Sequence, residues 1–196
     1  MAKAFDVEAA AAELAAAHPS DILQAALEAF SPAITISFSG AEDVVLIDMA
    51  SRLGASFRVF TLDTGRLNPE TLEFIDLVRE RYDVPIEAYS PQPEAVQDLV
   101  RAKGLFSFYR DGHEECCAIR KVEPLGRALA GKRAYVTGQR KDQSPSTRNH
   151  VPLVQLDPRF EEAGVELVKF NPLANWTSDQ VWREIRDRDI PYNPLH

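Results

Sequence analysis

AITISFSGAEDVVLIDMASRL, residues 33–53, contains a short β-rich strand, a polar loop and an apolar helix in direct succession. A strand, a loop and a helix follow one another twice more: FRVFTL (57–62) precedes DTGRLNPE and TLEFIDLVRERY, and VPIEAY (84–89) precedes PQPEAVQDLVRAKG. A fourth strand, RAYVT (133–137), precedes the GQRKDQSPSTR loop. Strands that alternate with helices of about ten residues or more indicate βαβ units. The sequence therefore predicts an α/β fold, with an open, mostly parallel sheet and helices on both faces.

The remaining segments extend this unit at both ends. Residues 1–30 are predicted to contain two helices, over 5–17 and 20–30, and residues 31–196 to form the α/β part of a single domain. VPLVQLD and ELVKFNPL are predicted to be short strands, and TSDQVWREIRDRD a helix capped by Thr177 or Ser178. The chain closes with IPYNPLH, which has the composition of a loop.

Charge is distributed unevenly along the chain. The formal net charge is −8, yet residues 110–150 contain nine Lys and Arg against five Asp and Glu, which is +4 and leaves −12 for the rest. A basic segment in an acidic protein favours a small anionic ligand, whereas nucleic-acid-binding proteins are more often basic overall. We therefore expect no nucleic-acid partner.

Location is predicted from what the sequence lacks. No apolar run approaches the roughly 18 residues of a membrane span, and no basic segment leads into an apolar core near the start, as in a secretory signal. The two cysteines are neighbours and cannot connect distant parts of the fold. We expect a cytoplasmic protein without a membrane partner, and a homo-oligomer stays open.

Three polar loops follow the first, second and fourth of the repeated strands, where parallel sheets bind ligands. Residues 37–43, SFSGAED, can form an anion cradle from backbone N–H groups, the Ser37 and Ser39 hydroxyls and the helix start after Gly40. Neither the GK[ST] of a Walker A loop nor the three spaced glycines of the dinucleotide fingerprint occur there. The alternative is an ordinary turn with Asp43 near the helix start.

The other two loops carry further candidates. In the turn after the second strand, Asp63 can hold a ribose hydroxyl and Arg66 an anion, with Thr64 and Gly65 between them. A turn stabilised by Asp and Gly is the competing interpretation. The GQRKDQSPSTR loop, with Gly138, Arg140 and Arg148, suits phosphate or sulfate, and its alternative is a solvated surface loop.

Cys116 and Cys117 are adjacent and lie before AIRKVEPLGRAL, which indicates a helix. On that helix Arg120 and Lys121 lie within about one turn of the thiols, and cations favour the thiolate form that binds metals. His113 makes an incomplete zinc site conceivable. Two buried, inert thiols are the alternative.

SGAEDVVLID, LDTGRLNPET, GLFSFYRDGHEECCAIRKVEPL, TGQRKDQSPSTR and KFNPLANWTSDQVW occur in this order. Together they resemble the assimilatory sulfonucleotide reductases, and among these the adenylyl-sulfate (APS) reductases. The resemblance covers roughly residues 30–196. It implies an adenine nucleotide α-hydrolase-like (PP-loop) fold over residues 31–196, and the cysteine pair favours APS over its 3′-phosphorylated analogue.

The resemblance also implies roles for individual residues. Cys116 and Cys117 would supply two of the four ligands of a [4Fe–4S] cluster, Lys121 would lie between the cluster and the substrate sulfate, and Arg148 would belong to the substrate site. The implied substrate-binding set is Ser37, Ser39, Gly40, Asp43, Leu62, Asp63, Thr64, Gly65, Arg66, Gly138, Arg140 and Arg148. The implied reaction is attack by a C-terminal cysteine on the sulfur of APS, which releases AMP, and thioredoxin then reduces the S-sulfocysteine to give sulfite.

The sequence departs from the family after PYNPLH, because the CxxC pair and the ECG(L/I)H segment with the nucleophile do not follow. We therefore expect a fragment or a truncated reductase that binds nucleotide without turnover. Two alternatives stay open. One is a PAPS reductase or another PP-loop enzyme, although SGAED in place of a lysine-bearing SGGKDS loop counts against ATP. The other is a non-catalytic nucleotide-binding module.

Overall fold

A six-stranded sheet in the order β3-β2-β1-β4-β6-β5 lies at the centre of the computed structural model, which describes residues 5–143, 150–161 and 164–195. The strands are β1 (Ile34–Phe38), β2 (Val59–Leu62), β3 (Ile86–Tyr89), β4 (Ala134–Val136), β5 (Val154–Leu156) and β6 (Val168–Phe170). All neighbouring strands are parallel except β5 and β6, which are antiparallel. The predicted open, mostly parallel sheet is confirmed.

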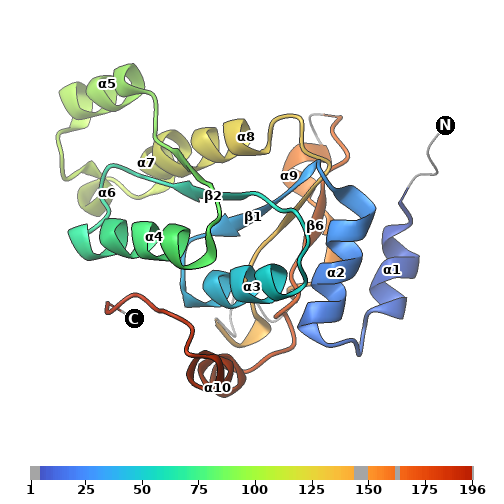
Figure 1. Cartoon of the computed structure of the whole chain (residues 1–196). Helices are drawn as coiled ribbons and strands as arrows, with labels where there is room; N and C mark the ends of the chain where they lie inside the picture. The colour runs from blue at the N-terminus through green and yellow to red at the C-terminus, as the bar shows by residue number, and fades with distance from the viewer. Residues whose placement is uncertain (1–4, 144–149, 162–163, 196) are drawn as a thin grey trace.

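Helices cover both faces of this sheet, as predicted (Figure 1). They are α1 (Val7–Glu13), α2 (Pro19–Phe30), α3 (Ala41–Arg52), α4 (Pro69–Tyr82), α5 (Pro93–Lys103), α6 (Ser107–Arg110), α7 (Glu114–Cys117), α8 (Glu123–Leu129), α9 (Pro158–Glu161) and α10 (Ser178–Arg188). A π-helical turn, η1 (Ala118–Val122), joins α7 to α8, and a 3₁₀ turn, η2 (Lys141–Gln143), follows β4. Figure 1 shows α3 and α4 on one side of β1 and α8 on the other.

The alternation of side chains along the strands divides the core in two. Ile34, Ile36 and Phe38 of β1 point to the face that α2, α3, α4 and α10 cover, where the larger apolar cluster lies. Phe60 and Tyr135 point to the opposite face and pack with α8. Because successive residues of a strand face opposite sides, each helical layer meets its own set of side chains.

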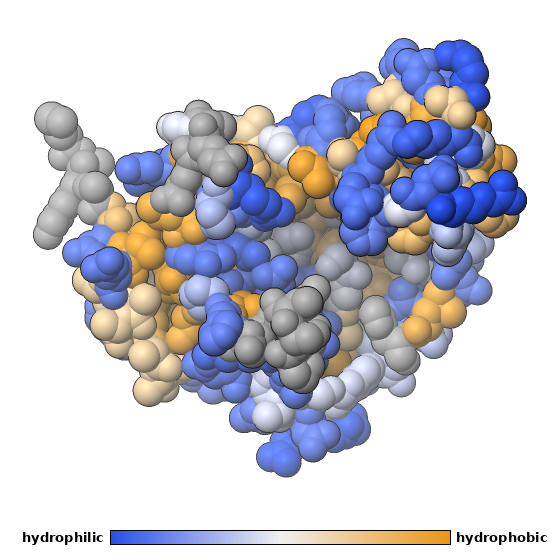
Figure 2. Space-filling view, turned by 180° about the vertical axis from the view of Figure 1, so that it is seen from behind, coloured by the Kyte–Doolittle hydropathy of each residue, from blue (hydrophilic) through white to orange (hydrophobic). Residues whose placement is uncertain are grey.

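The N-terminal helices belong to the same core. Asp6 caps α1, which ends at Glu13 and is therefore shorter than the predicted 5–17 helix. Pro19 occupies the first turn of α2, where a missing N–H costs nothing, and Ile22 and Leu23 of α2 are buried in the larger cluster. Seen from behind, hydrophobic surface residues gather on the side where the N-terminal helices lie, while the α5 corner is mostly hydrophilic (Figure 2).

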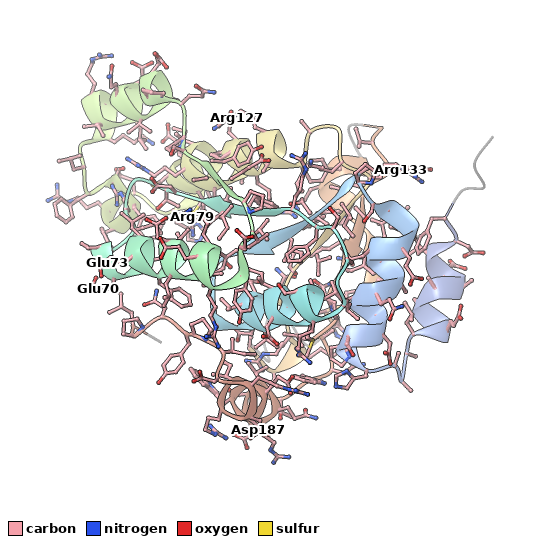
Figure 3. The ribbon with its side chains drawn as sticks, in the orientation of Figure 1. Glu70, Glu73, Arg79, Arg127, Arg133 and Asp187 are labelled. Atoms are coloured by element: carbon pink, nitrogen blue, oxygen red, sulfur yellow. The ribbon has the colours of Figure 1, made fainter. Side chains whose placement is uncertain are left out.

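The helix predicted at TSDQVWREIRDRD is present as α10, and Thr177 is its N-cap in a reciprocal capping box with Gln180. Its outer side is solvated: Figure 3 shows Asp187 on that side, as it shows Glu70 and Glu73 at the exposed start of α4. Within the described part of the chain, no helix is both long and apolar enough to cross a membrane.

The helix indicated by AIRKVEPLGRAL is interrupted by η1. The Glu123 N–H donates to the Ala118 carbonyl, five residues back, and Pro124 then has no N–H to donate. Proline inside a regular α-helix also clashes with the carbonyl four residues earlier, here that of Arg120. The wider π turn accommodates the proline and presents Lys121 from an irregular segment.

Candidate functional site

A cavity of about 480 Å³ opens where β1, β2 and β4 end, and the three predicted loops meet there. Among its lining residues are Ser37, Ser39, Gly40, Asp43, Leu62, Thr64, Gly138 and Lys121, all predicted from the sequence. Cys116, Cys117, Asp63, Gly65, Arg66 and Arg140 do not line it. Arg148 lies outside the described residues.

Asp43 organises the loop after β1. Its Oδ2 accepts hydrogen bonds from the Ser39 N–H (2.8 Å), the Ser39 hydroxyl (2.9 Å) and the Gly40 N–H (3.0 Å). Its Oδ1 accepts from the Gly138 N–H at 2.7 Å, across the sheet from β4. Burial raises the pKa of the Asp43 carboxyl, and the four hydrogen bonds oppose that shift by favouring the charged form. One carboxylate therefore joins two of the loops that line the cavity.

Gly138 is packed too closely for any side chain. A Cβ built there would lie 2.6 Å from the Glu42 Cβ, 2.8 Å from the Asp43 Oδ1 and 3.0 Å from the Asp43 backbone nitrogen. Two of these three atoms belong to backbone or to the first side-chain carbon and cannot swing away. The glycine is thus needed for the close approach of the β4 loop to the start of α3.

Arg140, predicted to bind an anion, does not line the cavity and instead forms ion pairs within the protein. Its side chain is only 6% exposed and contacts Glu42 Oε1 at 3.0 Å and Asp142 Oδ2 at 3.2 Å. Gln143 also donates to Glu42 Oε1. Burial alone would raise the pKa of Glu42, but the hydrogen bonds from Gln143 and Arg140 outweigh it and hold the pKa below its usual value. Arg140 therefore holds η2 against α3.

The turn after β2 is held by groups from the cysteine segment. Asp63 Oδ1 accepts the Gly65 N–H at 2.8 Å, which is the Asp–Gly turn considered as the alternative. The buried Arg120 donates to the Thr64 carbonyl at 2.6 Å, and Arg66 donates to the Leu105 carbonyl at 2.5 Å. Both arginines thus connect this turn to residues 105–120.

Cys116 is buried and Cys117 is half-buried, at the end of α7. Both are free thiols, and within the described part of the chain no group of three or more His, Cys, Asp and Glu side chains could hold a metal ion. His113 is exposed, and its Nδ1 lies 3.9 Å from Oε1 of Glu114. The described residues thus fit two thiolate ligands of an iron–sulfur cluster, and not its whole ligand set.

Two cationic residues that line the cavity were not predicted from the sequence. Arg159 follows β5, and Lys169 is the middle residue of β6. Lys169 could have been found by one signal, because a lysine between apolar residues in a short strand is unusual in a buried sheet. Arg159 carries no comparable signal, since its place depends on a contact with Tyr135 of β4, which is distant from it in the sequence.

Comparison with known proteins identifies the family of this chain. Residues 33–196 match the family model of the phosphoadenosine phosphosulfate reductase domain. The chain is 56% identical over 196 residues to the adenosine 5′-phosphosulfate reductase of Pseudomonas aeruginosa (strain LESB58), covering all of this chain and 73% of that protein. It is 55% identical over 194 residues to the chloroplastic 5′-adenylylsulfate reductase 1 of Arabidopsis thaliana, covering 97% of this chain and 42% of that protein.

Solved structures share the fold. The phosphoadenylyl-sulfate (PAPS) reductase of Candida auris, solved as a phosphate complex, superposes with a TM-score of 0.80 at 25% identity, covering all of this chain and 91% of that one. The Candida glabrata FMN adenylyltransferase in complex with ATP shares the fold alone, with a TM-score of 0.61 at 14% identity, covering all of this chain and 61% of that one. On the family match and the 56% identity, the chain belongs to the phosphoadenosine phosphosulfate reductase domain family.

Proposed function

We propose that this chain binds adenosine 5′-phosphosulfate in the cavity at the ends of β1, β2 and β4 and serves its reduction to sulfite and AMP in sulfate assimilation. The observation that carries the proposal is the joining of the SGAED loop and Gly138 through Asp43, in a cavity that Lys121 also lines and in a chain 56% identical to a protein named for this reaction. Leu62 and Thr64 line the cavity where β2 ends and are the proposed neighbours of the adenosine, and Lys121 is the proposed partner of the sulfate.

The reductant is proposed to be thioredoxin, and the compartment the cytoplasm. Reduction of APS breaks the bond between sulfur and the bridging phosphate oxygen, AMP keeps that oxygen, and two electrons from a dithiol end on sulfite. The support for thioredoxin is the sequence resemblance.

Cys116 and Cys117 are proposed as ligands of a [4Fe–4S] cluster. Bound there, the cluster would supply a redox-active, polarising group close to the anionic end of the substrate. The buried Arg120 then has a clear role, because it fixes the cysteine segment against the β2 turn that lines the cavity.

Iron and acid-labile sulfide in the anaerobically purified protein test the cluster. Both are expected in a longer version of the chain that carries all four cysteine ligands, and at background in its Cys116→Ser, Cys117→Ser variant. His113→Gln, which changes an exposed neighbour outside the pair, serves as the control and is expected to keep the iron. Iron that persists in the double variant would remove the cysteines from the ligand set.

The substrate is tested by calorimetric titration with APS, PAPS and ATP, and by sulfite release with reduced thioredoxin. We expect APS to bind more tightly than PAPS or ATP. Tighter binding of PAPS would make the chain a reductase of the 3′-phosphorylated substrate, and tighter binding of ATP would move it to another PP-loop activity. Binding of APS without sulfite release would fit either a reductase fragment without turnover or a nucleotide-binding module.

A further inference from the structure

The cavity is divided by charge. On the α3 side its titratable groups are Glu42 and Asp43, whose oxygens already accept hydrogen bonds from Arg140, Gln143 and backbone N–H groups. On the opposite, α8-covered side of the sheet the lining carries three cations among the described residues, Lys121, Arg159 and Lys169. An anionic group inside this cavity is therefore favoured on the second side.

Arg159 is held at the wall by a buried acceptor. Its Nε and one terminal nitrogen donate to the two oxygens of Asp157, at 3.0 and 2.6 Å, and the same terminal nitrogen donates to the Tyr135 hydroxyl at 2.9 Å. The Tyr135 hydroxyl in turn donates to Asp157 at 2.5 Å. Asp157 is 2% exposed, while half of the Arg159 side chain stays open to solvent. The guanidinium is thus fixed in place and still accessible.

Lys169 is placed deeper in the same wall. It pairs with Tyr135 across β4 and β6, is 7% exposed, and its Nζ lies 5.8 Å from the centre of the Tyr135 ring. The Nζ donates to Gln139 Oε1 at 2.7 Å, and Gln139 lines the cavity directly after Gly138. Lys169 therefore adds a fixed positive charge to the cavity wall beside Gln139, where it attracts an anionic ligand.

Strand order shows which residues lie at the two ends of the cavity. β2 carries Leu62 at one end of the cavity, β1 leads to Asp43 in the middle, and β4 with its neighbour β6 carries Gln139 and Lys169 at the other end. An adenosine nucleotide that lies across these strand ends with its adenine at Leu62 brings its 5′-phosphate to the far end.

We propose that Arg159 and Lys169 form a phosphate subsite, which binds the 5′-phosphate of the nucleotide and leaves the sulfate to Lys121. Asp157 and Tyr135 are positioning residues that hold Arg159. The inference rests on the proposed function only for the choice of an adenosine nucleotide as ligand, and it does not depend on reduction.

Calorimetric titration with AMP and with adenosine tests the subsite. Arg159→Gln and Lys169→Met are each expected to weaken AMP binding about tenfold, the usual loss for a charged hydrogen bond, and to leave adenosine unchanged. Lys169→Arg keeps the charge and is expected to keep most of the preference for AMP. Circular dichroism of each variant, with its unfolding midpoint, separates lost binding from lost folding.

The matched control is Arg133→Gln, an exposed arginine at the amino end of β4, which Figure 3 shows on the side where α2 lies. It is expected to bind AMP as the unmodified protein does. Equal losses for AMP and adenosine in folded Arg159→Gln would overturn the subsite, and so would a loss confined to APS.

Inorganic pyrophosphate, titrated in parallel, separates the subsite from the proposed function. One result is that the protein binds pyrophosphate but no AMP, with Arg159→Gln weakening the pyrophosphate binding. That result would support the anion subsite and refute an adenosine nucleotide as its ligand. If AMP binding depends on Arg159 but the protein binds no APS, the phosphate subsite is supported and the proposed reductase function is refuted. A protein that binds neither probe contradicts both.

Discussion

At the scale of single residues, Asp43 is the group on which the loop after β1 depends most. Both of its oxygens accept N–H donors, so in Asp43→Asn one oxygen is replaced by an NH₂ that faces donors in either orientation. We expect the free energy of unfolding to fall by about 1–3 kcal/mol, the cost of leaving buried donors unpaired. Urea unfolding measures it. Asp98→Asn on α5, where the carboxylate is 72% exposed, is the control and is expected to change stability by less than about 0.5 kcal/mol. A smaller loss in Asp43→Asn than in the control would refute the assignment.

Gly138 and Gly126 form a second comparison between residues. The Cβ of Gly138→Ala would meet the start of α3 at 2.6 to 3.0 Å, whereas a Cβ at Gly126, inside α8, meets nothing within 4 Å. We expect Gly138→Ala to cost about 1–3 kcal/mol through overpacking, and Gly126→Ala to stabilise by about 0.5–1 kcal/mol through helix propensity. Thermal unfolding tests this: the unfolding midpoint is expected to fall in Gly138→Ala and to rise in Gly126→Ala. Equal shifts would mean that the β4 loop can move away from α3.

At the scale of elements, η1 determines where Lys121 points. The π turn lies between α7 and α8, and Lys121 is its lining residue in the cavity. Lys121→Ala is expected to weaken APS binding about tenfold more than AMP binding, because AMP lacks the sulfate. Lys132→Ala, in the turn before β4, serves as the control. Equal losses for APS and AMP would show that Lys121 does not bind the sulfate.

The contact between β4 and the end of β5 predicts an acid-sensitive element. Burial by itself raises the pKa of Asp157, but the hydrogen bonds from Arg159 and Tyr135 outweigh it and lower the pKa to about 2, below the ordinary 3.8. A lowered folded-state pKa means that this contribution to stability is complete above about pH 4 and is lost as the pH falls toward 2. Because Arg159 is half exposed, we expect the Asp157–Arg159 ion pair to contribute no more than about 2 kcal/mol to the free energy of unfolding. Unfolding of Asp157→Asn between pH 2 and 6 should show a weaker pH dependence than the unmodified protein. If the free energy of unfolding depends on pH equally in both proteins, the Asp157–Arg159 ion pair is not the cause of the acid sensitivity.

At the scale of the whole molecule, periodicity predicted the sheet, the helical layers and the edge at which the cavity opens. These features follow from local alternation, such as that of Ile34, Ile36 and Phe38, and from the rule that parallel strands end at one edge. The positions of arginines were not predictable in the same way. Arg66 and Arg140 belong to loops at the correct edge, but one donates to the Leu105 carbonyl and the other to Glu42, both distant in sequence. Arg159 and Lys169 depend on the antiparallel pairing of β5 with β6, which local patterns do not encode.

The cavity draws its lining from α3, α4, η1 and the C-terminal segment, so a nucleotide bound there stabilises the whole fold. Asn193 both lines it and donates to Thr71 of α4 at 3.0 Å, which connects the last residues to the helical layer. A ligand that binds only the folded state raises the free energy of unfolding by RT ln(1 + [L]/Kd), about 2.7 kcal/mol at a hundredfold excess over Kd. We expect urea unfolding with AMP to follow this relation, using the Kd from calorimetry, and Asp43→Asn to lose part of the gain with its affinity. A gain well below the calculated one would mean that AMP also binds a partly opened chain. In that case the α3, α4 and η1 walls would not act as one cooperative unit.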